Sequence, residues 1–189
     1  MAENLDILDT QLLVYMANES EPWATDIYEE ILDGERIVFL PRYVATEFSE
    51  VMVRNRGAEG RNLTWEHLTA LWDAPAAVTP HPNRFRVDVR SVRNHATTRT
   101  LAAICDMEPK DAPILATAYR LAEFIRAYDP PNHSRGAIPN EPEEFRLKRL
   151  LNEIGVDTIT SRILTNERDF VGVDLDAIGL DSVIVTQVP

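Results

Sequence analysis

Five acidic side chains stand where carboxylates could do chemistry together. Asp9 directly follows the first predicted strand, Asp111 opens an amphipathic helix, and Glu47 lies at the edge of another helix's apolar face. In open α/β sheets, functional sites lie beyond the carboxyl ends of the strands, where these residues are expected. Each alone also fits an ordinary role as a helix cap, a turn residue or a surface acid. The five residues are Asp9, Glu47, Asp111, Glu167 and Asp169.

Carboxylates gathered at one sheet edge repel one another and therefore attract a cation. Two like charges about 5 Å apart repel by roughly 3 kcal/mol at an effective dielectric constant of about 20. Several such pairs rival the stability of a whole domain, about 5–15 kcal/mol. Ligand sets made only of oxygen favour Mg²⁺ or Mn²⁺ over zinc, and such ions assist phosphodiester hydrolysis. The acids therefore predict metal-assisted hydrolysis of a phosphodiester.

Strand and helix signals alternate along the chain and predict how these acids are positioned. Residues 36–41 form a continuous apolar strand, as parallel strands covered on both faces do. The strongest amphipathic helix begins at Asp111. The alternation predicts an α/β fold, a three-layer α/β/α sandwich with a central, mainly parallel sheet, in which residues 1–189 form one domain. Strands are expected at about 5–8, 36–41, 159–165 and 183–185, and helices at about 21–33, 43–56, 63–72, 91–105, 111–125 and 143–154.

The composition limits the classes of protein to which the chain can belong. With 19 Lys+Arg and 31 Asp+Glu, the formal net charge is −12, which disfavours nonspecific coating of nucleic acid. Few lysines and many acids keep halophilic proteins soluble, so a halophilic, archaeal source is compatible with this composition. The single cysteine, Cys105, excludes an intrachain disulfide. Glu3 and Asp6 oppose a signal peptide, and no apolar stretch is long enough for a membrane span, so a cytoplasmic protein is expected.

The acids lie in motifs that resemble those of the PIN-domain ribonucleases, a family that includes the VapC-type toxins of toxin–antitoxin pairs. Residues 7–15, ILDTQLLVY, resemble the family's first motif, usually Asp-Thr-Asn or Asp-Thr-Ser before apolar residues. Glu47, within ATEF, is similar to the acid on the helix after the second strand, and Asp111, followed by APILATA, is similar to the third acid. Residues 164–170, LTNERDF, resemble the family's Thr-Asn-Asp-x-Asp-Phe segment. The resemblance covers nearly the whole chain, in the same order.

The resemblance implies a PIN-like fold and an endoribonuclease that depends on Mg²⁺ or Mn²⁺. RNA is the implied substrate, a homodimer is common in the family, and a toxin would have an antitoxin protein as its partner. The resemblance assigns catalysis and metal ligation to Asp9, Glu47, Asp111 and Glu167, further metal ligation to Asp169, and orientation of the carboxylates to Thr10, Thr165 and Asn166.

Three departures from the family pattern leave alternatives open. Gln11 stands where Asn or Ser is usual, and Glu167 stands where Asp is usual. A catalytically weak or silent PIN-like module for RNA binding or scaffolding is therefore the alternative to a nuclease. The third departure is a loop-plus-helix insertion at about 127–155, roughly twenty residues longer than ordinary connections. It would cover the site's edge or offer a partner surface through Phe145, Leu147, Leu150 and Leu151.

The densest basic segment runs from Asn83 to Arg99. A solvated helical face is its ordinary interpretation, and a surface that follows a phosphate backbone is the alternative, since guanidinium groups suit phosphate recognition. The chain has neither a Gly-x-x-x-x-Gly-Lys loop nor a Gly-x-Gly-x-x-Gly motif, so binding of nucleotides or dinucleotides has no support. The predicted RNA contacts are Arg84, Arg86, Arg90 and Arg93.

Overall fold

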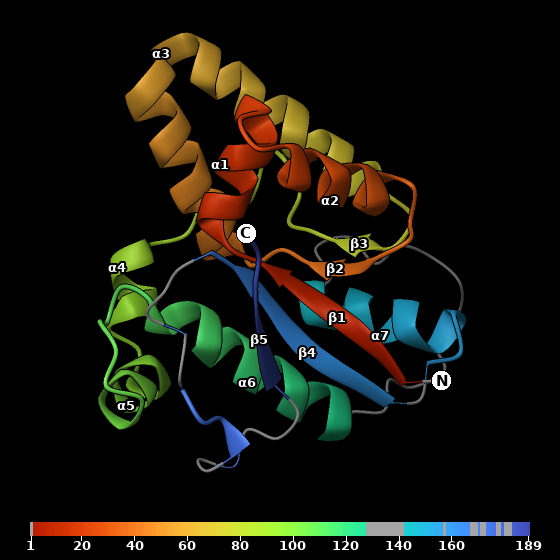
Figure 1. Ribbon diagram of the computed structural model, residues 1–189, viewed down its shortest axis with the longest axis vertical. Coiled ribbons are helices and arrows are strands. Elements are labelled where there is room, and N and C mark those ends of the chain that lie inside the picture. The colour runs from red at the N-terminus through yellow and green to blue at the C-terminus, as the bar shows by residue number, and fades with distance from the viewer. Residues whose placement is uncertain are drawn as a thin grey trace.

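The computed structural model describes residues 2–127, 142–156, 158–166, 170, 173–176, 179 and 183–189. Its strands are β1 (Ala2–Leu8), β2 (Ile37–Phe39), β3 (Ala77–Val78), β4 (Thr158–Thr165) and β5 (Val183–Gln187). They form one sheet in the order β3-β2-β1-β4-β5, and every neighbouring pair is parallel (Figure 1). The predicted α/β fold with a parallel central sheet is confirmed.

Helices cover both faces of this sheet and complete the three-layer sandwich (Figure 1). On one face lie α1 (Thr10–Asn18), α2 (Pro22–Leu32) and α3 (Arg42–Asp73). On the other face lie α6 (Ala112–Ala127) and α7 (Glu143–Glu153). The short helices α4 (Val89–Arg93) and α5 (Ala96–Ile104) lie beyond the carboxyl ends of the strands. Among the described residues, no helix combines the length and the apolar character that crossing a bilayer requires.

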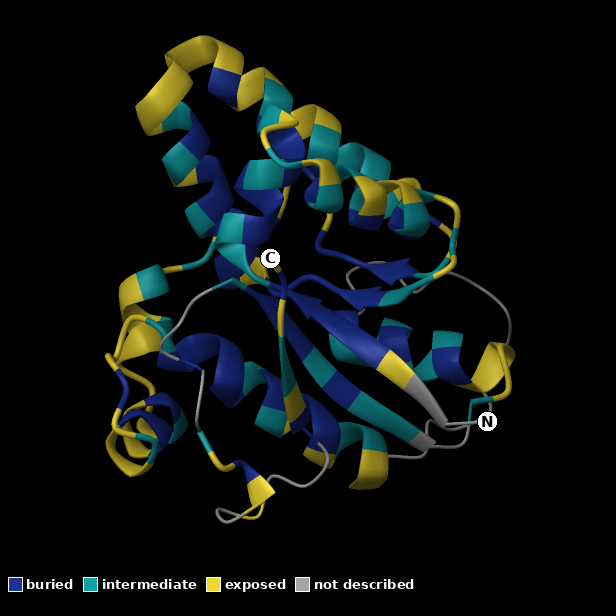
Figure 2. Ribbon diagram, in the orientation of Figure 1, coloured by how far each residue is buried: buried dark blue, intermediate teal, exposed yellow. Residues whose placement is uncertain are grey.

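The core lies around β1, the middle strand of the sheet. Leu5, Ile7 and Leu8 are fully buried, because helices pack against both faces of the strand (Figure 2). Many exposed residues lie on the outer turns of the helices and on loops, while β1 and β5 carry a few at the sheet itself (Figure 2). Helix α7 belongs to this core as well, because Leu147 and Leu151 are buried. These two leucines therefore offer no surface to a partner, contrary to one of the two roles considered for the 127–155 segment.

One charged residue interrupts the apolar centre of the sheet. Asp6 of β1 is only 1% exposed. Its carboxylate accepts hydrogen bonds at 2.5 and 2.8 Å from its register partner on β4, Arg162, and at 2.9 Å from Arg36. Burial alone would lower the pKa of Arg36, but hydrogen bonds to Asp6 and Glu30 raise it, so this guanidinium stays charged. Two arginines therefore neutralise one buried carboxylate and tie three neighbouring segments together.

Helix α3 bends sharply at Gly57, whose φ of 58° and ψ of −123° are not helical (Figure 1). A positive φ favours glycine because it has no Cβ. The sequence predicts breaks at both Gly57 and Gly60, but only Gly57 leaves the helical conformation. Gly60 has a different role, because a Cβ at this position would lie 2.0 Å from the backbone oxygen of Met52. The two arms of α3 therefore touch backbone to backbone at Gly60.

Gly60→Ala is expected to lower the free energy of unfolding by about 1–3 kcal/mol, the usual effect of overpacking. The added methyl group must push apart the two arms of α3, because its neighbour is backbone and cannot rotate away. Urea unfolding followed by circular dichroism measures the loss. Asn62→Ala, at an exposed position on the same arm, is the control and should shift stability by less than about 0.5 kcal/mol. Equal unfolding midpoints for the two variants would contradict the close contact.

Several predicted boundaries are wrong for local reasons. Helix α1 is missing from the sequence prediction, and β3 is too short to leave a pattern. The predicted helix 91–105 is two helices, because His95 adopts an extended conformation and its ring accepts a hydrogen bond from the Thr97 amide. Asp88 caps the first of them by accepting from the Arg90 amide.

Candidate active site

The site lies where the strand order of the sheet reverses. From β1 the chain adds β2 and β3 on one side, and later β4 and β5 on the other. The carboxyl ends of β1 and β4 are therefore the switch point, at which open α/β sheets bind their ligands. Asp9 follows β1 and caps α1, while Thr165 ends β4.

A pocket of about 300 Å³ opens at this switch point. Three of the five predicted acids line it, from three separate segments: Asp9 after β1, Glu47 on α3 and Asp111 just before α6. The structure therefore brings together residues that are up to 102 positions apart in the sequence. The other lining residues are Thr10, Gln11, Tyr43, Glu50, Val51, Arg54, Arg93, Lys110, Ile114 and Phe170.

Two hydrogen bonds fix the carboxylate of Asp9. The backbone N–H of Thr10 donates to Oδ1 at 2.7 Å, and the hydroxyl of Thr165 donates to Oδ2 at 2.7 Å. Thr165 therefore makes a direct hydrogen bond to Asp9, as its predicted orienting role requires. Thr10 orients a second acid too, because its hydroxyl donates to Oε2 of Glu47 at 3.0 Å. Asn166 has a different partner: its amide donates to the Tyr15 hydroxyl at 3.1 Å.

Glu47 is held by an arginine from α4. The Nη2 of Arg93 donates to Oε1 of Glu47 at 2.7 Å, and the Glu47 side chain is 18% exposed. Arg93 was predicted as an RNA contact, whereas here its guanidinium neutralises a predicted metal ligand. Because Thr10 occupies the other oxygen, both oxygens of Glu47 have protein partners. A cation bound by Glu47 would therefore share this carboxylate with the positive charge of Arg93.

Tyr43 forms a buried wall of the pocket and responds to its charges. Burial raises the pKa of the Tyr43 hydroxyl well above its usual value of 10, and the carboxylates of Asp9 and Glu47 raise it further. The hydroxyl is therefore protonated at neutral pH.

The donor chemistry of this pocket fits a hard divalent cation, since Asp9, Glu47 and Asp111 offer only carboxylate oxygens. Their present arrangement is open, because within the described part of the chain no three acidic, histidine or cysteine side chains form a group able to hold a metal ion. Glu167 and Asp169 lie outside the described residues, so their predicted ligation stays a prediction.

Basic residues surround the acid pocket on the side away from the sheet. All four predicted RNA contacts are exposed, and Arg90 and Arg93 line a second hollow of about 750 Å³ beside the pocket. Arg54 and Lys110 line both hollows and were missed in the sequence. The sequence spacing could have identified Arg54, because it lies seven residues after Glu47 and therefore on the same face of one helix.

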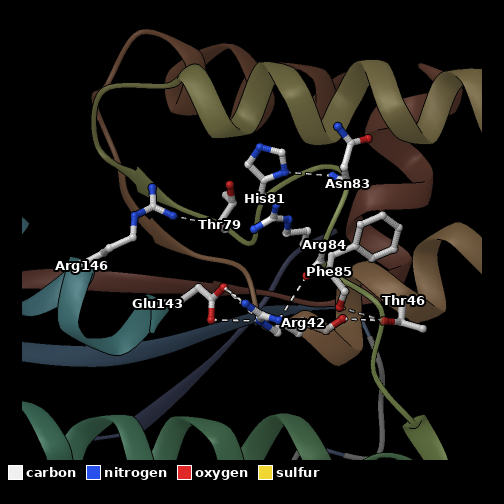
Figure 3. A network of polar contacts seen from close by, with 9 residues as sticks. All are labelled: Arg42, Thr46, Thr79, His81, Asn83, Arg84, Phe85, Glu143 and Arg146. Atoms are coloured by element: carbon white, nitrogen blue, oxygen red, sulfur yellow. Dashed lines mark hydrogen bonds and ion pairs between the residues drawn. The ribbon is translucent and has the colours of Figure 1, made fainter. Parts of the chain in front are cut away.

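A network of polar contacts holds the segment that carries Arg84 and Arg86 (Figure 3). Arg42, at the start of α3, donates to Glu143 of α7 at 2.7 Å and to the carbonyl of Arg84 at 3.1 Å. Further along the same network, Arg146 of α7 donates to the carbonyl of Thr79 at 2.8 Å. Helix α7 therefore braces the connection from β3 to α4, on which the basic residues lie.

Comparison with models of protein families, with curated proteins and with solved structures finds no match for this chain. The resemblance to PIN-domain ribonucleases therefore gains no support from a family model, a relative or a similar structure. The functional argument rests on the residues of the pocket and their contacts.

Proposed function

We propose that this protein is a divalent-metal-dependent endoribonuclease with a PIN-like site. The observation that carries the proposal is the convergence of Asp9, Glu47 and Asp111 on one pocket at the switch point of the sheet. Neither an isolated surface acid nor a helix cap requires such convergence. The arrangement supports hydrolysis of a phosphodiester better than chemistry that needs a thiol or an imidazole, because the described residues that line the pocket include no cysteine and no histidine.

Each residue has a specific part in this proposal. Asp9, Asp111 and Glu47 would hold Mg²⁺ or Mn²⁺, with Glu167 and Asp169 as further predicted ligands. Such an ion, when bound, activates water and stabilises the leaving oxygen of a phosphodiester. The bonds from Thr165 and Thr10 fix the direction of the Asp9 carboxylate and so preorganise the site.

The rim of the pocket supplies the positive charge that an RNA strand needs. Arg54, Arg93 and Lys110 lie on the same walls as the acids. A guanidinium group binds phosphate oxygens through paired N–H donors, so the scissile phosphate can be held while the acids act beside it. A net charge of −12 therefore does not exclude an RNA substrate, because the charge at the rim differs from that of the whole chain.

One observation favours the second candidate, an RNA-binding or scaffold module with a silent site. Arg93 occupies Glu47, and the described acids are not arranged as a complete metal site. In that case RNA would bind to the basic rim and remain intact. The role of a toxin rests on the family resemblance alone, and an antitoxin gene beside this one would support it.

Cleavage of single-stranded RNA is expected with Mn²⁺ or Mg²⁺ and is expected to stop with a chelator. Because a metal that binds only the folded protein stabilises it, a metal concentration of about 100 times Kd should add about 2.7 kcal/mol to the unfolding free energy. Gel assays and thermal melts in high salt measure the two effects. RNA binding without cleavage and without a metal-dependent shift in Tm would favour the silent module.

A further inference from the structure

Two more hollows continue from the acid pocket along α3. The first, of about 450 Å³, shares Glu50 and Arg54 with the acid pocket. The second, of about 350 Å³, shares Ser49, Arg61 and Arg86 with the first. Because each hollow shares lining residues with the next, the three lie side by side in a row, called here the α3 groove. It runs from the acids to the second arm of α3, beyond the bend at Gly57.

The α3 groove is basic beyond Glu50. Arg54, Arg61 and Arg86 line it, and none of the three forms an ion pair with another described residue. Other arginines of this acidic chain are paired, for example Arg56 with Glu59 at 3.0 Å. Arg86 makes only a long hydrogen bond, of 3.4 Å, to the Ser49 hydroxyl. Unpaired guanidinium groups along a groove are suited to a row of phosphates.

The groove ends at an exposed tryptophan. The Trp65 side chain is 52% exposed, and no other aromatic residue in the described part of the chain is classed as exposed. Asn83, which is exposed, lines the same hollow and offers its amide group there. An exposed indole costs free energy in water, while it provides a flat face on which an unpaired base can stack. Arginines interleaved with an aromatic face are typical of surfaces that bind single strands.

We propose that the α3 groove binds the single-stranded RNA on one side of the cleaved bond and that Trp65 stacks on one of its bases. This assignment rests on the proposed function, since the groove begins at the acid pocket. Arg54, Arg61 and Arg86 contact the phosphates, and Trp65 anchors the strand at the far end. A duplex fits poorly, because its bases are already stacked on one another and cannot cover the indole.

Binding of a short fluorescein-labelled single-stranded RNA to the full chain tests the proposal, with Asp9→Asn present in every variant so that the strand stays intact. Trp65→Ala is expected to weaken binding about tenfold, and Trp65→Phe, which keeps a stacking face, should retain most of the affinity. Arg61→Gln should weaken binding and lower the slope of log K against log salt by about 0.7, the share of one phosphate. RNA should also quench the fluorescence of Trp65.

Two matched controls lie outside the groove. Ile104→Ala removes an apolar side chain of similar exposure from α5, and Arg126→Gln removes an exposed arginine from α6. Both should bind RNA like the parent, and thermal melts verify that all variants are folded. Equal affinity of Trp65→Ala and Ile104→Ala would overturn the proposal. Equal affinity for a duplex and for the single strand would also overturn it. The same holds if polyglutamate competes as well as RNA, or if the protein does not bind RNA.

Failure of the groove and failure of the nuclease give different results. If metal-dependent cleavage requires Asp9 but is unchanged by Trp65→Ala, the proposal for the α3 groove is rejected and the proposal of a nuclease is retained. Binding that depends on Trp65, in a protein that cleaves no RNA with any metal, would support the groove and reject the nuclease.

Discussion

Replacing Asp9 with asparagine is expected to lower the rate of RNA cleavage by more than about 100-fold. Asp9 lies at the switch point, and its carboxylate is fixed by Thr10 and Thr165. Loss of a group that orients a metal ligand lowers affinity or activity by about 10- to 100-fold, and loss of the ligand's charge has a larger effect. Thr165→Val should therefore cause an intermediate loss of about 10- to 100-fold. Single-turnover cleavage of labelled RNA at saturating metal measures both rates.

The control for this series is Asp26→Asn. Asp26 is an exposed acid on α2, so its substitution makes the same change in net charge away from the pocket. It should leave the rate unchanged. Asp111→Asn should resemble Asp9→Asn, since both carboxylates line the pocket. Cleavage that persists in the double variant with both substitutions would reject these acids as the site.

Asp6→Asn is expected to lower the free energy of unfolding by about 3–5 kcal/mol, the usual effect of removing one partner from a buried ion pair. The substitution removes the carboxylate that pairs with Arg162 and leaves Arg36 with Glu30 as its remaining ion-pair partner. These arginine side chains are only 24% and 23% exposed, so water cannot fully replace Asp6. Urea unfolding monitored by circular dichroism gives the loss.

A double-mutant cycle separates this ion pair from other effects of the substitution. In an Arg162→Gln background, Asp6→Asn should be less destabilising, because the Arg162 charge that would lose its partner is already gone. Asp26→Asn again serves as the control and should change stability by less than about 0.5 kcal/mol. A loss below about 1 kcal/mol for Asp6→Asn would contradict the importance of the buried pair.

The acids of the pocket could be predicted because two of them lie at the boundary of an element and Glu47 lies at the edge of a helix's apolar face. Asp9 ends a strand and Asp111 precedes a helix, and such positions leave a signal in the local sequence. The pair between Glu47 and Arg93 could not be predicted, because its partners lie 46 residues apart on two helices. Trp65 likewise has no local signal, since its exposure depends on the bend at Gly57 and on how the two arms of α3 pack.

The sheet could be predicted from its apolar runs, and the missed elements have physical reasons. Five of the nine residues of α1 are buried, including the consecutive Leu12, Leu13 and Val14, so the helical period is hidden. Strand β3 has two residues, which are too few to show an alternation of apolar and polar side chains. Helix α2 begins at Pro22, one residue after the predicted start at about 21, because proline suits the first helical position.

Because β1 lies between β2 and β4, its two neighbouring strands are synthesised at very different times. The partner on one side, β2, lies about 30 residues further along the chain, while the partner on the other side, β4, lies 156 residues further. In a nascent chain whose β4 has not yet been synthesised, the central strand β1 therefore has one unpaired edge. Such an edge can pair with other chains. The nascent chain also lacks the Thr165 hydroxyl that holds Asp9. The pocket therefore cannot take its final form before β4 has joined the sheet, because Asp9 until then lacks one of the two donors that fix its carboxylate.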